Sequence, residues 1–177
     1  MSNNSTRFTV TLAAIILTLA LLGGGQFLWQ QYAIDKPLAE VLNSIDGIDS
    51  FYLDNSNKIN DTVKVHISLS NVKNLQKTYQ AVHDGAIKVL GHNQISIFIH
   101  DNRTPELEQL YYTVHLYVQE GISTGNFAAM AERIQQKTSA SGVETQVYVD
   151  ASNVYLSFKS INADMYVVVP RQQTEVK

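Results

Sequence analysis

Residues 121–125 read G-I-S-T-G and match G-x-S-x-G, the pattern around the nucleophilic serine of many hydrolases. In those enzymes the serine lies on a sharp turn between a strand and a helix, whereas here a helical period precedes it. The hydrolase order also requires a histidine after the serine, and His115 is the last histidine of the chain. We therefore expect no catalysis by Ser123, and we expect Ser123 or Thr124 to cap the next helix.

Imidazole is a common metal ligand, so the five histidines are candidates for a metal site. They are His66, His83, His92, His100 and His115. No pair has the i, i+4 spacing of a helical zinc site, and H-E-x-x-H is absent. His66 and His100 fall on the polar faces of two predicted strands, so their rings could approach each other if those strands are neighbours. We expect solvated sheet-face histidines, and we predict no metal ligand and no cofactor-binding residue.

His100, Asp101 and Glu106 form a possible acid/base cluster. A turn followed by a helix N-terminus explains both carboxylates, because the helix dipole favours negative charge there. No glycine-rich loop follows a strand, so the sequence offers no phosphate cradle. Residues 60–62 and 102–104 match the glycosylation sequon, which matters only in a eukaryotic secretory pathway. We predict no catalytic residues, and we expect that the protein is not an enzyme.

Tyrosines on the last three predicted strands suggest a binding surface instead. Tyr148, Tyr155 and Tyr166 lie on the strand faces opposite the valines, and Phe98 raises the same question in the first half of the chain. An exposed aromatic patch would suit a partner. Cross-strand tyrosine pairs that only stabilise a sheet are commoner, so we favour that interpretation. A third possibility is that the face of Phe98, Ser96 and His100 packs against the second half, which would give a layered domain.

Periodicity and turn residues predict an α+β fold with the element order α-β-β-α-β followed by α-α-β-β-β. The expected helices are 37–45, 71–90 closed by Gly91, 105–120 capped by Thr104, and 126–138, with an interruption at 121–125. The expected strands are 48–54, 63–69, 95–100, 143–149, 154–158 and 163–169, with a loop at 55–61 and a turn at 150–153. Short connections predict mostly antiparallel sheets with helices on one face of each. Whether there is one sheet or two stays open.

The charge and the absence of cysteine exclude several classes of function. Arg7 is the only charged side chain before Asp35, so the rest of the chain carries 12 basic and 16 acidic residues. An acidic domain without a basic stripe is a poor partner for nucleic acid. With no cysteine, the chain has neither disulfides nor thiolate zinc sites.

Residues 8–29 form an uncharged, mostly apolar stretch of 22 residues, long enough for a helix to cross a bilayer. We predict an uncleaved single-pass anchor, with a cleaved signal peptide as the alternative. Arg7 favours a cytoplasmic N-terminus at 1–7, so the domain would lie outside the cytoplasm, at the cell membrane. The predicted organisation continues with a linker at 30–36, a domain at 37–170 with sub-halves 37–100 and 104–170, and a polar tail at 171–177.

The order α-β-β-α-β over Pro37 to His100 resembles the ring-building motifs of membrane-anchored secretion and sporulation proteins. Those modules also follow one N-terminal helix and pack side by side into rings. The resemblance is one of element order, covers about a third of the chain and carries over no site residue. It implies self-association as one possible role.

The leading hypothesis is a non-enzymatic, membrane-anchored domain of a bacterial cell envelope that acts by contact with a protein partner or by self-association. The alternative is an extracytoplasmic module that binds or senses a small ligand between its two halves and works through a membrane partner. The specific ligand or partner lies beyond the sequence.

Overall fold

The computed structural model of the chain describes residues 17–19, 36–54, 62–91 and 94–171. The chain divides into two compact units, 1–41 and 42–177. Across the described ranges, no helix is both long and apolar enough to cross a membrane. Apart from residues 17–19, which are helical, the predicted anchor at 8–29 lies outside those ranges, as do the predicted loop at 55–61, His92 and most of the C-terminal tail.

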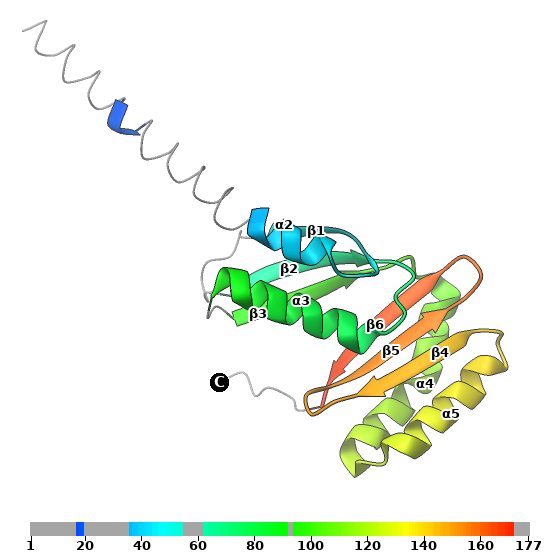
Figure 1. Cartoon of the computed structure of the whole chain (residues 1–177). Helices are drawn as coiled ribbons and strands as arrows, with labels where there is room; N and C mark the ends of the chain where they lie inside the picture. Colours follow the sequence, from blue (N-terminus) through cyan, green and yellow to red (C-terminus); the bar gives the residue numbers. More distant parts are fainter. Residues whose placement is uncertain (1–16, 20–35, 55–61, 92–93, 172–177) are drawn as a thin grey trace, which may run out of the picture. The chain divides into compact units, whose positions relative to one another are not determined.

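The fold is α+β, as predicted. The described elements are α2 (Lys36–Asn43), β1 (Ile48–Asp54), β2 (Thr62–Leu69), α3 (Leu75–Leu90), β3 (Gln94–His100), α4 (Pro105–Thr124), α5 (Phe127–Ser139), β4 (Glu144–Val149), β5 (Asn153–Lys159) and β6 (Asp164–Pro170) (Figure 1).

The strands form two separate three-stranded sheets, which answers the question the sequence left open. The first sheet has the order β1-β2-β3, with β1 antiparallel and β3 parallel to β2. The second sheet has the order β4-β5-β6 and is antiparallel throughout. Pairing is therefore mostly antiparallel, as predicted. The exception follows from α3, whose length lets the chain cross back and start β3 in the same direction as β2.

One face of the second sheet packs against α4 and α5 (Figure 1). Val114 and Val118 of α4, Ile134 of α5, and Leu156 and Phe158 of β5 are all fully buried in this core. The apolar residues repeat every 3.6 positions on the helices and every 2 positions on the strand, and the faces that they form meet in this core, as the sequence predicts.

The opposite face of the second sheet is also covered, because α3 packs on β4 and β5. Tyr79 of α3 meets Tyr155 edge to face at a centroid distance of 5.7 Å. Tyr155 and Tyr166 are 1 % and 4 % exposed, so β5 is buried on both faces. The prediction of helices on only one face is wrong for this sheet. An exposed patch of Tyr148, Tyr155 and Tyr166 is also excluded, because α3 covers that face. The predicted packing of the Phe98 face against the second half is wrong, since Phe98 is 43 % exposed and His100 is exposed.

Hydrogen bonds fix the first half to the second. The backbone N–H of Val72 donates to Tyr166 Oη at 3.0 Å, and that of Asn71 donates to Asp164 Oδ2 at 3.0 Å. On the other side, the Tyr166 N–H donates to Asp101 Oδ2 at 2.7 Å. Tyr166 thus joins the two halves through both its side chain and its backbone.

Several helix boundaries differ from the prediction for identifiable reasons. α3 begins at Leu75 rather than Asn71, because Asn74 supplies the cap and accepts from the Lys77 N–H at 3.0 Å. α4 begins as predicted, with Thr104 as cap and Pro105 in the first turn. The predicted interruption at 121–125 is wrong, since α4 continues to Thr124 and ends at Gly125 in a left-handed conformation. Gly91 has positive φ, as predicted for a helix end, although its ψ of −146° lies outside the left-handed helical region.

Candidate functional site

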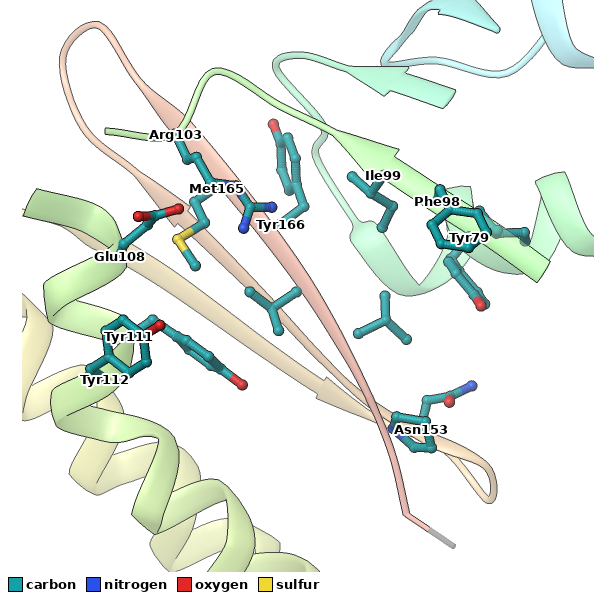
Figure 2. A pocket seen from close by; sticks show the side chains of 14 residues that line it. Tyr79, Phe98, Ile99, Arg103, Glu108, Tyr111, Tyr112, Asn153, Met165 and Tyr166 are labelled. Carbon is teal, nitrogen blue, oxygen red and sulfur yellow. The ribbon is translucent and has the colours of Figure 1, made fainter. Parts of the chain in front are cut away.

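The candidate site is a hollow of about 480 Å³ between the two sheets. β3 and β6 are edge strands of their respective sheets, and both line it (Figure 2). α4 contributes Tyr111 and Tyr112, and α3 contributes Tyr79. We call this hollow the β3–β6 groove. The groove lies between β3 and β6 because Asp101, directly after β3, accepts a hydrogen bond from the Tyr166 N–H near the start of β6. Both strands run on from this contact and line the groove.

Apolar side chains make up much of the groove wall. Ile99 comes from β3, Met165 and Val167 come from β6, and Pro170 lies at the far end. Tyr112 is 65 % exposed, although it is a large aromatic residue. Mostly apolar concave surfaces with a few polar groups are typical of binding sites.

An ion pair closes one end of the groove. Arg103 donates from Nε to Asp101 Oδ1 at 2.6 Å and from Nη2 to Asp101 Oδ2 at 2.8 Å. The Asp101 side chain is 1 % exposed and also accepts from the Tyr166 N–H. The hydrogen bond with Asp101 raises the pKa of Arg103, so the guanidinium stays charged. Both carboxylate oxygens of Asp101 are therefore occupied by hydrogen bonds within the protein. Asp101 is poorly placed to act as a general base.

The tyrosine hydroxyls of the groove are neutral donors and acceptors. Burial raises the pKa of Tyr79, and burial followed by the neighbouring Tyr112 raises the pKa of Tyr111. Burial also raises the pKa of Tyr166 to about 12. None of these groups is activated as a nucleophile or base near neutral pH, because activation would require a lowered pKa.

A polar network lies beside the far end of the groove. Asp150 accepts from Tyr155 Oη at 2.7 Å, from the Ser152 and Asn153 N–H groups at 2.7 Å each, and from Gln80 Nε2 at 3.0 Å. Burial by itself would raise the pKa of Asp150, but these hydrogen bonds outweigh burial and lower it. The carboxylate therefore stays ionised and stabilises the turn before β5.

The open face of the first sheet carries a second cluster, which we call the aromatic row: Tyr52, His66 and Phe98. These residues pair across β1, β2 and β3. His66 stacks on Tyr52 at a centroid distance of 4.4 Å and on Phe98 at 4.8 Å. His66 Nδ1 lies 2.9 Å from His100 Nε2, so the predicted approach of the two histidines is confirmed.

The other predicted candidates are not brought together. Ser123 Oγ donates to the Gln119 carbonyl at 2.9 Å, and Thr124 Oγ1 donates to the Glu120 carbonyl at 2.8 Å. Neither hydroxyl is the cap of α5, which is Asn126. His115 lies on α4 and His83 on α3, and Glu106 lies in the first turn of α4 as predicted. Within the described residues, no three histidine or acidic side chains are grouped to hold a metal ion.

Sequence reasoning missed most residues of the β3–β6 groove. Tyr111, Tyr112 and Met165 were assigned to elements without a site, because nothing in their spacing shows that β3 and β6 are edge strands. The exposure of Tyr112 was detectable in part, since it lies off the apolar stripe of α4.

A second concavity of about 1080 Å³ lies near the N-terminus of α4 and the turn between β5 and β6. Ile161 in that turn is 97 % exposed. This concavity has neither a strand edge nor an aromatic cluster, so we take the β3–β6 groove as the candidate site.

Comparisons of the chain with protein-family models, with curated proteins and with solved structures give no match.

Proposed function

We propose that this protein is a non-enzymatic, membrane-anchored domain that acts by contact with another protein chain at a bacterial cell envelope. Residues 8–29 would form the anchor, with residues 1–7 in the cytoplasm and the α+β domain outside it. The observation that carries the contact role is the β3–β6 groove, where two strand edges border an apolar, tyrosine-rich wall.

Strand edges suit an extended segment of a partner, because an added strand can bond to unpaired backbone groups. On β6, the Tyr166 N–H points away from β5, since it reaches Asp101. Backbone direction alternates along a strand, so the Val168 N–H points to the same outer side. Side chains of an added segment would meet Ile99, Val167 and Tyr111, which favours apolar residues at alternate positions.

The chemistry of the groove supports binding over catalysis. Its buried carboxylate is held by Arg103 and a backbone N–H, and burial raises the pKa of Tyr79, Tyr111 and Tyr166. A reaction would need a group with an activated pKa or a base within reach of a nucleophile.

Site-specific photocrosslinking in the full-length protein in its membrane tests the proposal. A photoreactive residue at position 112 is expected to give one discrete protein adduct, and the adduct should disappear when Ile99→Arg fills the groove. Position 119, exposed elsewhere on α4, is the matched control and should give none. Equal adducts from positions 112 and 119, or an adduct insensitive to Ile99→Arg, would count against the groove as the contact surface.

Topology is tested separately with a reporter fused after Lys177. Activity outside the cytoplasm is expected, and activity inside it would contradict the proposed orientation.

The alternative function is binding of a small ligand in the same groove. Its volume of about 480 Å³ favours this alternative, because it lies within the range of small-molecule sites. A ligand screen by thermal shift separates the two roles. A compound that raises the midpoint of the wild type but not of Ile99→Arg would support the alternative.

A further inference from the structure

The charges at one end of the β3–β6 groove do not cancel. Among the described residues that line the groove, Arg103 and Glu108 carry a charge. Arg103 is bound through two nitrogens to Asp101, whose side chain is 1 % exposed, so this pair is neutral as a whole. Within the same part of the chain, the Glu108 carboxylate has no ion-pair partner. One guanidinium and two carboxylates therefore leave this end of the groove with a net negative charge.

Charged groups farther along the groove have opposite charges beside them. Lys64 Nζ lies 5.9 Å from the centre of the Phe98 ring and 4.0 Å from Asp54 Oδ2. At the far end, Arg171 lies beside the Asp150 carboxylate, because it donates to the carbonyl of the same residue. The uncompensated charge that an incoming group would meet is therefore that of Glu108.

Glu108 shares one face of α4 with Tyr111 and Tyr112. Spacings of three and four residues bring these side chains together on a helix, and all three line the groove (Figure 2). Glu108 and Tyr112 are exposed. The two rings meet at 47° with their centroids 6.5 Å apart, so neither covers the face of the other. A positive group would gain from the carboxylate and from the negative ring faces together.

The rest of the groove suits the stem of a long basic side chain. Ile99 and Val167 offer apolar surface, and the methylenes of lysine or arginine pack on such surface while the charged head reaches beyond it. The whole chain favours the same sign of charge. Beyond the predicted anchor it carries 12 basic and 16 acidic residues, so its field attracts a basic segment.

We propose that the partner segment in the β3–β6 groove is basic, and that a lysine or arginine of this segment binds Glu108 beside Tyr111 and Tyr112. This inference rests on the proposed function and adds to it the charge of the partner. An acidic segment would be repelled by Glu108. A wholly apolar one would shield the carboxylate from water without pairing it, which costs free energy.

Peptide selection on the full-length protein in a neutral detergent tests the proposal. The probe is a phage-displayed library of random heptapeptides. Ile99→Trp fills the groove without adding charge, so peptides that bind the wild type but not this variant are those that bind in the groove. We expect these peptides to be enriched in lysine and arginine, and depleted in aspartate and glutamate, relative to the unselected library.

Fluorescence anisotropy of the most enriched peptide, labelled with fluorescein, then assigns the contact. Glu108→Gln should weaken binding by about 2–5-fold, as expected for an exposed ion pair with cation–π contacts. Glu108→Lys should weaken it by on the order of tenfold, because like charges then face each other. Glu106→Gln is the matched control, since it removes the same charge from the same turn of α4 outside the groove. Its affinity should equal that of the wild type.

A double-mutant cycle separates a direct contact from a structural effect of the substitution. Norleucine in place of the peptide lysine, or citrulline in place of arginine, should weaken binding to the wild type but not to Glu108→Gln. Circular dichroism confirms that each variant is folded.

The outcomes distinguish this inference from the proposed function. Groove-dependent peptides without an excess of basic residues, or wild-type affinity in folded Glu108→Gln, would overturn the inference and leave the proposed function standing. A selection in which binding never depends on Ile99 would count against the groove as a contact surface, and the inference would fall with it.

Discussion

The hydroxyl of Thr145 is buried on β4 and has no hydrogen-bond partner within the part of the chain that the structure describes. A buried donor left unsatisfied costs about 1–3 kcal/mol, and an apolar group of the same shape avoids that cost.

Thr145→Val should therefore raise the free energy of unfolding by about 1 kcal/mol. Urea denaturation followed by circular dichroism measures the change, and Thr113→Val on the exposed side of α4 is the control. A loss of stability in Thr145→Val would show that the hydroxyl has a partner, such as a buried water.

Tyr155 makes the stability of the domain depend on alkaline pH. Burial, and then its hydrogen bond to Asp150, raises the pKa of Tyr155 to about 12. In the unfolded chain a tyrosine ionises near pH 10, so the folded state binds this proton more tightly. The stabilisation is complete below about pH 10 and is lost as the pH rises from about 10 to 12.

The free energy of unfolding should fall over that pH window, by up to about 2–3 kcal/mol for this group. Urea titrations at a series of pH values from 8 to 12 measure the fall. In Tyr155→Phe the fall should be shallower, and an identical slope would show that other groups cause it.

Individual side chains were predictable where one strand decides their position. The placement of His66 and His100 on one open face follows from the period of 2 along each strand. Their contact at 2.9 Å, and the stacking on Tyr52 and Phe98, depend on strand order and register. Neither the strand order nor the register can be predicted from a single segment of the sequence.

At the scale of elements, α4 and α5 approach closely at one glycine. A Cβ added at Gly121 would lie 2.5 Å from Met130 Sδ and 2.9 Å from Met130 Cβ. The sulfur can rotate away, but the Cβ is fixed to the α5 backbone.

In Gly121→Ala this overlap should cost about 1–3 kcal/mol, and the helix-propensity gain of about 1 kcal/mol offsets part of it, so the net destabilisation should be up to about 2 kcal/mol. Urea denaturation gives the value, with Ser123→Ala on the exposed side of α4 as the control. A gain in stability would mean that the two helices can separate without loss of packing.

Gly121 also explains why the sequence misplaced the end of α4. Glycine is a common sign of a helix end, so two glycines within five residues predicted an interruption. Only Gly125 ends the helix, whereas Gly121 is required for packing. The strand boundaries were easier to predict from the sequence, because valines and isoleucines alternate with polar residues along them. Pro170 marks the end of the last strand.

At the scale of the whole molecule, the two halves pack together through α3, which lies against β4 and β5. Tyr79, Val72 and Gln80 of the first half contact Tyr155, Tyr166 and Asp150 of the second. The sequence predicted a layered arrangement only through the Phe98 face, which is exposed, and did not predict that α3 covers Tyr155 and Tyr166. Both an exposed and a covered face can carry tyrosine, so residue type alone does not decide which face is covered.

A substitution in the second half should therefore destabilise the first half equally. Ile134→Ala removes a fully buried side chain of α5 and should cost about 2–5 kcal/mol. Native-state hydrogen exchange of the Ile67 amide in β2 and the Leu156 amide in β5 measures the effect in each half.

The same loss of protection at both amides is expected, because one cooperative unit opens as a whole. Unchanged protection at Ile67 would mean that the first half unfolds separately.

The hydrogen bond between Val72 and Tyr166 cannot form until most of the chain has been synthesised. These residues are 94 positions apart, so Val72 leaves the ribosome long before its partner exists. At about 5–20 residues per second, the delay is about 5–20 s. During that interval the face of α3 that will cover β5 has nothing to pack against. A holding chaperone would find its substrate in that half-made chain, and the need for it would end when β6 is complete.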